Sequence, residues 1–161
     1  DVKDELGKKV KLIIDGGKSK IGLESTIIDL TDKFAVLRPG GITLGQLKKA
    51  LNRKIKLKKN SKNIKSPGQS KLHYSPGIPM RLNAHYAKKN EAFVHFTKKK
   101  IRRNDHFTLT RKGSMKEAAK NLFSLLRLLR KKGYASIAVG KIPNKGLGLA
   151  INDRLKKASN K

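Results

Sequence analysis

The chain has 161 residues, 37% of them hydrophobic, which is enough for one domain or two small ones with a modest core. It contains no cysteine, which excludes disulfide bonds and thiolate metal sites, and no apolar run approaches the roughly 20 residues of a membrane-spanning helix. The net charge of +29 can serve contact with nucleic-acid phosphates, or it can reflect a compositional bias that also enriches Asn and Ile. Both explanations predict weak, salt-sensitive affinity for RNA.

The first forty residues predict a set of β-strands separated by glycine turns. Apolar runs over 10–15, 25–30 and 34–38 have the length and composition of strands. The connection 31–33 is short enough for a hairpin between the last two strands, and Gly40-Gly41 ends the third. Three strands of this kind predict part of a sheet.

A short helix and then a linker are predicted next. Thr43 and Gln46 have the spacing of a capping box, which opens a helix ending near residue 51. Between 52 and 79 apolar residues become sparse, and Lys, Asn, Ser, Gly and Pro dominate, as in a linker. The pair His73-Tyr74 lies inside this segment, although a plain linker needs no such pair.

Strand and helix patterns alternate in the second half of the chain. Strands are predicted over 93–96, 107–109 and 134–139, and helices after a capping box at 114–117 and over about 146–158. The first of these helices carries an apolar stripe made of Ala118, Ala119, Leu122, Phe123, Leu125, Leu126 and Leu129. The alternation favours an α/β fold in which helices pack on a small sheet.

Polar side chains gather where the first strands begin and end. Ser25, Thr26 and Arg38 occupy such positions, where an anion or nucleotide pocket needs polar groups, and the planar fork of Arg suits phosphate or carboxylate. Glu24 beside Ser25 could supply an acid next to a hydroxyl. Alternatively, Ser25 and Thr26 bond to their own backbone and Arg38 is a surface residue. The local pattern leaves both interpretations open.

The glycines invite comparison with phosphate-binding loops, and the comparison fails. Gly17 and Gly22 have the glycine spacing of a Walker loop, but Leu23-Glu24 stands where Lys and Ser or Thr are required. The Gly-Leu-Gly run at 146–148 lacks the third glycine of a dinucleotide fingerprint. Turns that let helix and sheet approach closely are the better prediction for these glycines. The four histidines are ten or more residues apart, so no metal site is predicted.

Three blocks of sequence, taken together, resemble one enzyme family. The first comprises Asp15-Gly16-Gly17, the run Gly-Leu-Glu-Ser-Thr-Ile-Ile-Asp at 22–29, and Leu37-Arg38-Pro39-Gly40. The second is Ser66-Pro67-Gly68-x-x-x-x-His73-Tyr74-x-Pro76. The third comprises the helix pattern at 117–127 and the run 146–155. In order and spacing they resemble the long-form threonylcarbamoyl-AMP synthases, namely the second half of their YrdC-type catalytic domain, their interdomain linker and their Rossmann-like C-terminal domain.

The resemblance implies an α/β architecture in three parts. Residues 1–51 correspond to the C-terminal part of a YrdC-like catalytic sheet, 52–79 to an extended linker or lid, and 80–161 to a small Rossmann-like domain. The first half of the catalytic domain, with its basic phosphate-binding group, is expected to precede Asp1. A separate N-terminal half is therefore an expected partner, and the chain alone is expected to be inactive.

The resemblance also implies a reaction. The family makes threonylcarbamoyl-AMP and pyrophosphate from L-threonine, bicarbonate and ATP, and the product feeds threonylcarbamoyladenosine formation in tRNA. The implied enzyme is a nucleotidyltransferase that uses ATP with Mg²⁺. A cytoplasmic location is expected, because the first residues lack the basic end and apolar run of a signal peptide.

By the same resemblance, Ser25 contacts threonine, and Arg38 and Tyr74 face ATP. Thr26 and His73 are additional candidates for the pocket or its lid, and no catalytic side chain or metal ligand is assigned. The alternative hypothesis is a basic RNA-binding accessory or relic protein without catalytic activity. A steep fall of RNA affinity with salt, together with no effect of ATP or threonine on stability, would favour that alternative.

Overall fold

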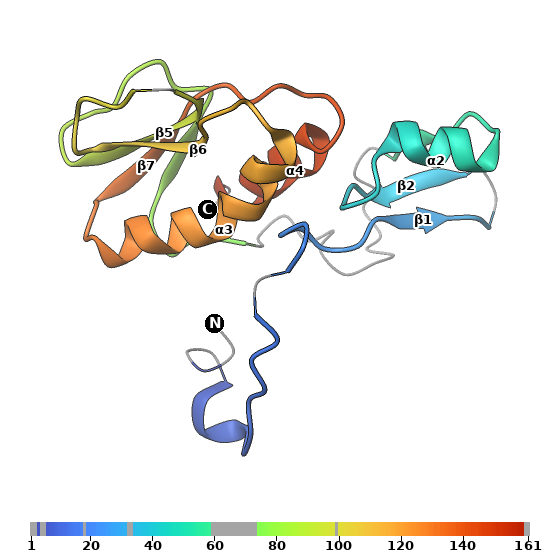
Figure 1. Cartoon of the computed structure of the whole chain (residues 1–161), viewed down its shortest axis with the longest axis horizontal. Coiled ribbons are helices and arrows are strands. Elements are labelled where there is room, and N and C mark those ends of the chain that lie inside the picture. The colour runs from blue at the N-terminus through green and yellow to red at the C-terminus, as the bar shows by residue number, and fades with distance from the viewer. Residues whose placement is uncertain are drawn as a thin grey trace.

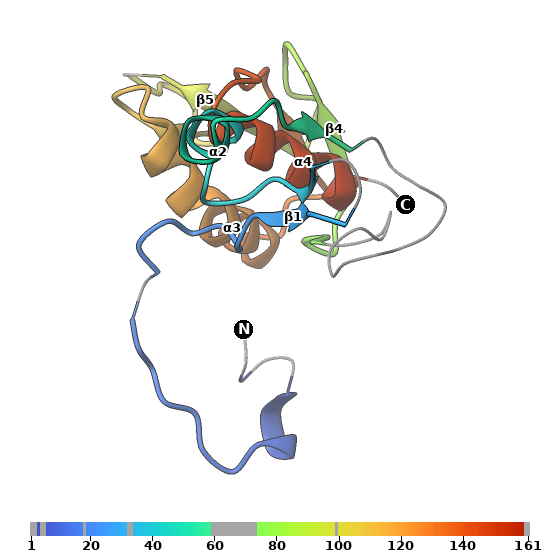
Figure 2. The same cartoon turned by 90° about the vertical axis from the view of Figure 1, so that its right-hand side faces the viewer.

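The protein consists of two compact parts and a trailing N-terminal segment (Figure 1). The computed structural model describes residues 3, 6–17, 19–31, 34–58, 74–98 and 100–159. One part holds a small sheet and one helix, and the other holds a larger sheet and two helices. Figure 2 shows the N-terminal segment standing clear of both parts. Within the described residues, no helix is long and apolar enough to cross a membrane.

The first sheet contains three short strands in the order β1-β2-β3. β1 (Ile27–Asp29) and β2 (Ala35–Arg38) pair in antiparallel fashion, so the predicted hairpin is confirmed. β3 (Lys56–Leu57) pairs parallel to β2 and was not predicted. It lies inside the range 52–79 that the sequence assigned to the linker, so the first part extends past residue 51.

The predicted helix forms as α2 (Leu44–Leu51), and its start shows both bonds of a capping box. The Gln46 amide donates to Thr43 Oγ1 at 3.3 Å, and the Thr43 amide donates to Gln46 Oε1 at 2.9 Å. The helix packs on the first sheet through a small cluster of buried side chains: Val36, Leu47 and Ile55.

The strand predicted over 10–15 is wrong. Residues 7–9 form a single 3₁₀ turn, η1 (Gly7–Lys9), and the residues after it join no β-ladder in the described part of the chain. Leu12 is 77% exposed and Ile14 is 84% exposed. An apolar run of strand composition becomes a strand only when a partner supplies its hydrogen bonds. Among the described residues, no neighbouring segment does so.

The second sheet contains four parallel strands in the order β4-β7-β5-β6. β5 (Glu91–Thr97), β6 (His106–Thr110) and β7 (Ser136–Val139) confirm the predicted strands. β4 (Met80–Leu82) was missed, because three residues that begin just after a proline give too short a pattern. All-parallel pairing is typical of α/β folds, which the alternation of strand and helix patterns predicted.

Helices α3 (Met115–Lys131) and α4 (Gly148–Ser159) cover one face of this sheet. Both were predicted to within a few residues. The core between them and the sheet is made of Ala92, Val94, Leu109, Ala118, Ala119, Leu122, Leu126, Leu129, Ile137, Val139, Ile142, Ile151 and Leu155. Burial of this apolar stripe supplies most of the stabilisation of the second part.

The start of α3 departs from the predicted capping box in one of its two bonds. Ser114 accepts from the Glu117 amide at 3.2 Å, as predicted. The Glu117 carboxylate, however, accepts from Thr110 Oγ1 at 2.6 Å instead of reaching back to the helix start. The Thr110 hydroxyl in turn accepts from the Ser114 amide at 3.1 Å. The helix is therefore tied to the end of β6.

Candidate functional site

The loop after β2 fixes the backbone around Ser25. A Cβ atom on Gly40 would lie 2.5 Å from the carbonyl carbon of Ser25 and from the amide nitrogen of Thr26. The neighbouring Gly41 amide donates to the carbonyl oxygen of Glu24 at 3.1 Å. Residues 24–26 therefore rest directly on this glycine pair, which explains why the run Pro-Gly-Gly follows the strand.

Arg38 and Ser25 are brought into direct contact. Arg38 Nε donates to the Ser25 carbonyl oxygen at 3.1 Å, and Arg38 Nη2 donates to Ser25 Oγ at 3.0 Å. The Arg38 side chain is only 9% exposed, so the interpretation of Arg38 as an ordinary surface residue is wrong. Two donors of one planar guanidinium fix both the backbone and the hydroxyl of Ser25.

Thr26 uses its hydroxyl to close the turn behind the site. Its Oγ1 donates to the Ile42 carbonyl oxygen at 2.7 Å and accepts from the Ile42 amide at 3.1 Å. Both bonds reach the backbone of Ile42, 16 positions later, and not the backbone of Thr26 itself, as the local alternative expected. Its role as a pocket residue stays a prediction.

Tyr74 lies beside Glu24 in an unusual backbone conformation. Its φ is 68°, in the left-handed region that bulky residues rarely adopt and that is common at functional sites. Its ring lies 5.7 Å from the ring of Phe123 on α3, between centroids. Burial, and then the hydrogen bond to Glu24, raise the pKa of Tyr74 to about 12. The phenol therefore stays a neutral hydrogen-bond donor at physiological pH.

Glu24 is held in its charged form by the same contacts. Burial acts to raise the pKa of this carboxyl, but hydrogen bonds from Tyr74, the backbone and Arg154 outweigh it, so the pKa lies below its ordinary value. The carboxylate faces Arg154 instead of forming an acid–hydroxyl pair with its neighbour Ser25. Its partners belong to two later segments of the chain.

Arg154 on α4 joins these segments. Its side chain is fully buried, and its Nε donates to Glu24 Oε2 at 2.9 Å. Its Nη1 donates to Asp153 Oδ2 at 2.7 Å, and Lys157 Nζ contacts the same oxygen at 2.7 Å. The Arg154 Cζ atom lies 5.1 Å from the centroid of the Tyr74 ring. Its Nη2 is buried and has no hydrogen-bond acceptor among the described residues.

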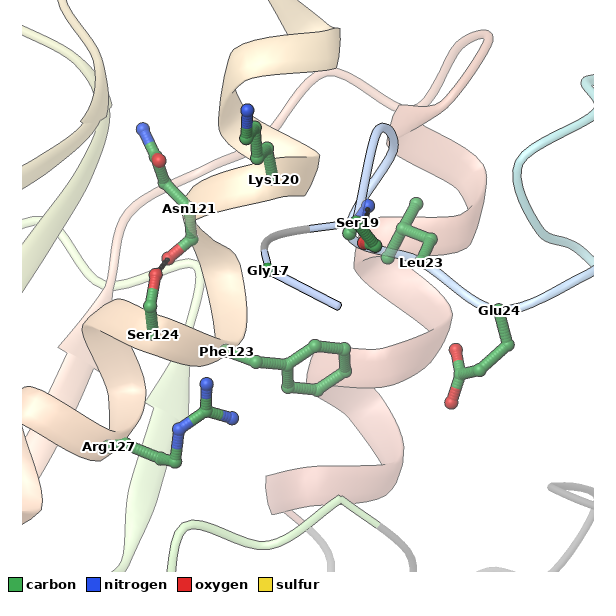
Figure 3. A pocket seen from close by; sticks show the side chains of 10 residues that line it. Gly17, Ser19, Leu23, Glu24, Lys120, Asn121, Phe123, Ser124 and Arg127 are labelled. Carbon is green, nitrogen blue, oxygen red and sulfur yellow. Dashed lines mark hydrogen bonds between the residues drawn. The ribbon is translucent and has the colours of Figure 1, made fainter. Parts of the chain in front are cut away.

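The segment before Glu24 packs directly on α3. A Cβ atom on Gly22, whose φ is 76°, would lie 2.5 Å from the Cα of Lys120. This close approach is the role predicted for the glycine turn. A pocket of about 580 Å³ opens beside it, between residues 17–24 and α3. Figure 3 shows side chains of α3, including Phe123 and Arg127, facing this segment across the pocket.

The remaining predictions concern histidines and metal ions. His73 lies outside the described residues. His95 and His106 lie side by side on neighbouring strands, with Nε2 and Nδ1 2.9 Å apart. In the part of the chain that the structure describes, no three His, Cys, Asp or Glu side chains lie close enough to hold a metal ion.

Comparison with protein families agrees with this arrangement. A family described as threonylcarbamoyl-AMP synthase, C-terminal domain, matches residues 42–160. The chain belongs to the threonylcarbamoyl-AMP synthase family. A second family, which includes YrdC and is described as telomere recombination, matches residues 1–40. The resemblance inferred from the three sequence blocks is thus confirmed.

Curated relatives in this synthase family come from archaea, bacteria and fungi. The threonylcarbamoyl-AMP synthase of Pyrococcus abyssi is 32% identical over 98% of the chain. Those of Bacillus subtilis and Schizosaccharomyces pombe are 29% and 30% identical, also over 98% of the chain. The chain spans about half the length of these relatives, since it covers 52%, 51% and 47% of them in turn.

Solved structures of a synthase confirm the α/β fold. The crystal structure of Pyrococcus abyssi Sua5 complexed with L-threonine matches with a TM-score of 0.81 at 29% identity, over 98% of this chain and 52% of that one. A variant of the same enzyme, with alanine in place of a histidine and the tyrosine after it, matches with a TM-score of 0.79 at 27% identity. It covers 98% of this chain and 51% of that one.

The sequence missed Arg154 as part of this site. It lies in a block that carried the family resemblance, but no local pattern gave it a role. Its partner Glu24 was considered only with its neighbour Ser25. The signal that could have found Arg154 is its spacing: it follows the apolar residues Ala150 and Ile151 by four and three positions, which places an arginine on the apolar face of the predicted helix.

Proposed function

We propose that this chain is part of a threonylcarbamoyl-AMP synthase. The full enzyme would make threonylcarbamoyl-AMP and pyrophosphate from L-threonine, bicarbonate and ATP, and the product would serve threonylcarbamoyladenosine formation in tRNA. The proposal also keeps the three-part organisation and a cytoplasmic location, where these substrates occur. Its main support is that three predicted site residues from separate segments lie close together: Arg38 binds Ser25, and Tyr74 lies beside Glu24, the residue before Ser25.

Each of these side chains has a proposed task. Ser25 would contact threonine, and its hydroxyl is already oriented by Arg38. Arg38 and Tyr74 would face the nucleotide, with Thr26 and His73 as further candidates for the pocket or its lid. A tyrosine that closes over ATP would exclude water, which protects a carbamate and a mixed anhydride from hydrolysis. Mg²⁺ would enter with ATP, because this ion is usually bound through substrate phosphates and keeps much of its water.

An N-terminal half of the catalytic domain is the proposed protein partner. Residues 10–15 have strand composition, yet Leu12 and Ile14 are largely exposed. A strand-like apolar segment without a ladder partner among the described residues is a site where another strand can add. The partner half would supply that strand and the opposite wall of the substrate site.

The test is pyrophosphate release by the completed enzyme. The chain is co-expressed with the N-terminal half of the Bacillus subtilis relative, purified as a complex, and supplied with ATP, bicarbonate and L-threonine. We expect release that requires both ATP and L-threonine and that is absent for the chain alone. Release that does not depend on threonine, or no release from the complex, contradicts the proposed function.

Substitutions then test the assigned residues. Arg38→Lys keeps the charge but loses the planar fork, so we expect a loss of roughly tenfold or more in kcat/KM. Ser25→Ala should raise the KM for threonine more than that for ATP. Lys156→Met changes an exposed cation on α4 and serves as the matched control. Equal effects of Ser25→Ala on both KM values would contradict its assignment.

Contact with tRNA is proposed only as a weak, electrostatic interaction. The net charge of +29 supports it, since released counterions drive such binding. Filter binding of tRNA at increasing salt should show a steep fall in affinity, and ATP with threonine should still stabilise the complex of both halves against heat. If salt-sensitive binding is found without any effect of ATP or threonine, the accessory RNA-binding alternative is favoured instead.

A further inference from the structure

Three segments that are far apart in the sequence meet at one buried side chain. Arg154 on α4 contacts Glu24 of the first part through a hydrogen bond of 2.9 Å. The same guanidinium lies over the ring of Tyr74, which belongs to the predicted linker, at 5.1 Å from the centroid. Tyr74 and Glu24 also lie next to each other, since each side chain shifts the pKa of the other. The three side chains therefore form a closed triangle, which we call the Arg154 triad.

The triad is directly continuous with the proposed substrate site. Glu24 precedes Ser25 in the chain, and the Ser25 hydroxyl is held by Arg38 at 3.0 Å. The Glu24 carbonyl oxygen accepts a hydrogen bond from the Gly41 amide, so the residue that Arg154 binds is also anchored to the loop after β2. Tyr74 is both a member of the triad and a proposed nucleotide contact. Arg154 thus contacts both Glu24, which precedes the proposed threonine contact Ser25, and Tyr74, the proposed nucleotide contact.

Stability alone is a poor explanation for this buried arginine. Replacing a buried ion pair with apolar side chains of similar size is often neutral or stabilising, so such a pair is weak evidence for a stability role. Arg154 also leaves Nη2 buried without an acceptor among the described residues, which adds a cost. An apolar side chain at this position would fill the same space under α4 without the free-energy cost of a buried, unsatisfied donor.

We propose that Arg154 is a positioning residue for the synthase reaction, through which the C-terminal domain orients Glu24 and holds the Tyr74 ring over the nucleotide side of the site. The inference rests on the proposed function and goes beyond it, because it assigns a part in the reaction to a domain that contributes none of the predicted substrate contacts. Arg154 touches no substrate. Its effect is exerted through the orientation of Tyr74 and Glu24.

The proposal predicts which kinetic constant changes. Tyr74 is the nucleotide-side residue, and its ring loses its cationic neighbour when Arg154 is replaced. We expect Arg154→Met to raise the KM for ATP about tenfold, as for loss of a desolvated cation–π contact, with a smaller effect on the KM for threonine. Arg154→Lys keeps the cation without the planar fork, so it should restore part of this loss.

The deciding measurement is spectroscopic and needs no activity. The full 161-residue chain is labelled with 3-fluorotyrosine, which gives one ¹⁹F resonance for each of its three tyrosines. Tyr74→Phe identifies the resonance of Tyr74. Arg154→Met should move that resonance toward the free amino acid and leave those of Tyr86 and Tyr134 in place, and Arg154→Lys should return it part of the way.

Two control variants separate positioning from general damage. Lys157→Met removes another cation of α4, which shares Asp153 Oδ2 with Arg154, while all three side chains of the Arg154 triad are kept. Lys156→Met changes an exposed neighbour. Neither should move the Tyr74 resonance. If all three resonances shift with Arg154→Met, the helix has been disturbed as a whole, and the Arg154→Lys spectrum then decides, because the proposal requires its shift to be confined to Tyr74.

The outcomes separate the two proposals. A Tyr74 resonance that is unchanged in Arg154→Met, or that Lys157→Met moves equally, overturns the positioning role. Loss of pyrophosphate release by the wild-type complex contradicts the proposed function and leaves the spectroscopic result standing. If the complex is active and Arg154→Met lowers kcat without raising the KM for ATP, the assignment of Arg154 to the nucleotide side is overturned.

Discussion

The two parts of the molecule bury very different amounts of apolar surface. In the described residues, the second part has a core cluster of thirteen buried hydrophobic side chains, and the first part has a cluster of three. Several large apolar side chains of the first part are instead exposed, among them Leu30, Ile42 and Leu51. Because burial of apolar area is the main source of stability, the second part can fold by itself, while the first needs a neighbour.

The contact between the parts is correspondingly specific. Among the described residues it includes Gly22 against the backbone of α3, Leu23 against the apolar core of the second part, and Glu24 against Arg154. Close approach, apolar packing and charge thus act together over three consecutive residues.

The largest effect is expected from the core of the second part. Leu122 is 1% exposed, so Leu122→Ala should lower the free energy of unfolding by about 3–4 kcal/mol, through lost burial and the cavity left behind. Leu128 lies on the same helix but is 44% exposed, and Leu128→Ala should cost less than about 0.5 kcal/mol. Urea unfolding followed by circular dichroism measures both. Similar costs at the two positions would mean that the second part lacks a well-packed core.

Acid should lower the folding stability mainly of the second part. Hydrogen bonds from Arg81 at 3.0 and 2.7 Å lower the pKa of Glu91 from 4.5 to about 2, although burial opposes them. The stabilisation that the charged Glu91 gives to the folded state is present above pH 4.5 and is lost as the pH falls toward 2. The reason is that the Glu91 carboxyl takes up its proton at a higher pH in the unfolded chain than in the folded one. We expect a loss of roughly 2–3 kcal/mol over this range.

Thermal unfolding between pH 5 and pH 2.5 checks this prediction. Glu91→Gln should flatten the pH dependence over this range and lower stability at neutral pH. Asp15→Asn, in the N-terminal segment, is the matched control and should leave the slope unchanged. If both variants show the wild-type slope, other carboxyl groups cause the acid sensitivity.

A methyl group at Gly22 should detach the two parts from each other. Gly22→Ala places a Cβ 2.5 Å from the Lys120 backbone at a φ of 76°, so the docking of residues 21–26 should lose about 2 kcal/mol. Hydrogen exchange of this segment and of α3 measures the loss. Gly16→Ala has no atom within 4 Å and serves as the control. Unchanged protection in Gly22→Ala would show that the contact does not hold the parts together.

The smallest effect should come from the core of the first part, and it should grow when the partner is added. Leu47 is 8% exposed in a cluster of three, so Leu47→Ala should cost about 1 kcal/mol in the chain alone, since such a small cluster can collapse around the gap. With the N-terminal half bound, the cost should rise toward about 2 kcal/mol. A cost that is the same with and without that half would mean that the first part is already complete.

Local patterns predicted the fold best where they were long or chemically distinctive. The apolar stripe of α3 and the capping box of α2 correspond to the observed elements. β3 and β4 were missed, because two or three residues cannot show a period and their pairing is decided by neighbours. The run 10–15 failed for the opposite reason: its pattern is that of a strand, but a strand also requires a partner.

The same distinction holds for the site. Ser25 and Arg38 could be picked out because they stand at strand ends within a recognisable block. Their mutual hydrogen bond, and the contact of Glu24 with Arg154, join positions far apart in the chain, and no local pattern specifies such pairs. Gly22 was correctly assigned to a close approach, but the backbone that it meets depended on the packing of the parts, and the close approach at Gly40 was not predicted.

The pair of Glu24 and Arg154 spans 130 positions, nearly the whole chain, and this sets an order of events during synthesis. At about 5–20 residues per second, a ribosome needs roughly ten seconds to make the second member after the first. In that interval Arg38 can already bind Ser25, but the Tyr74 ring still lacks its contact with the Arg154 guanidinium. A nascent chain interrupted before its last helix would therefore contain the contact between Arg38 and Ser25 but would lack Arg154. The complete arrangement of the site can form only after translation has reached α4.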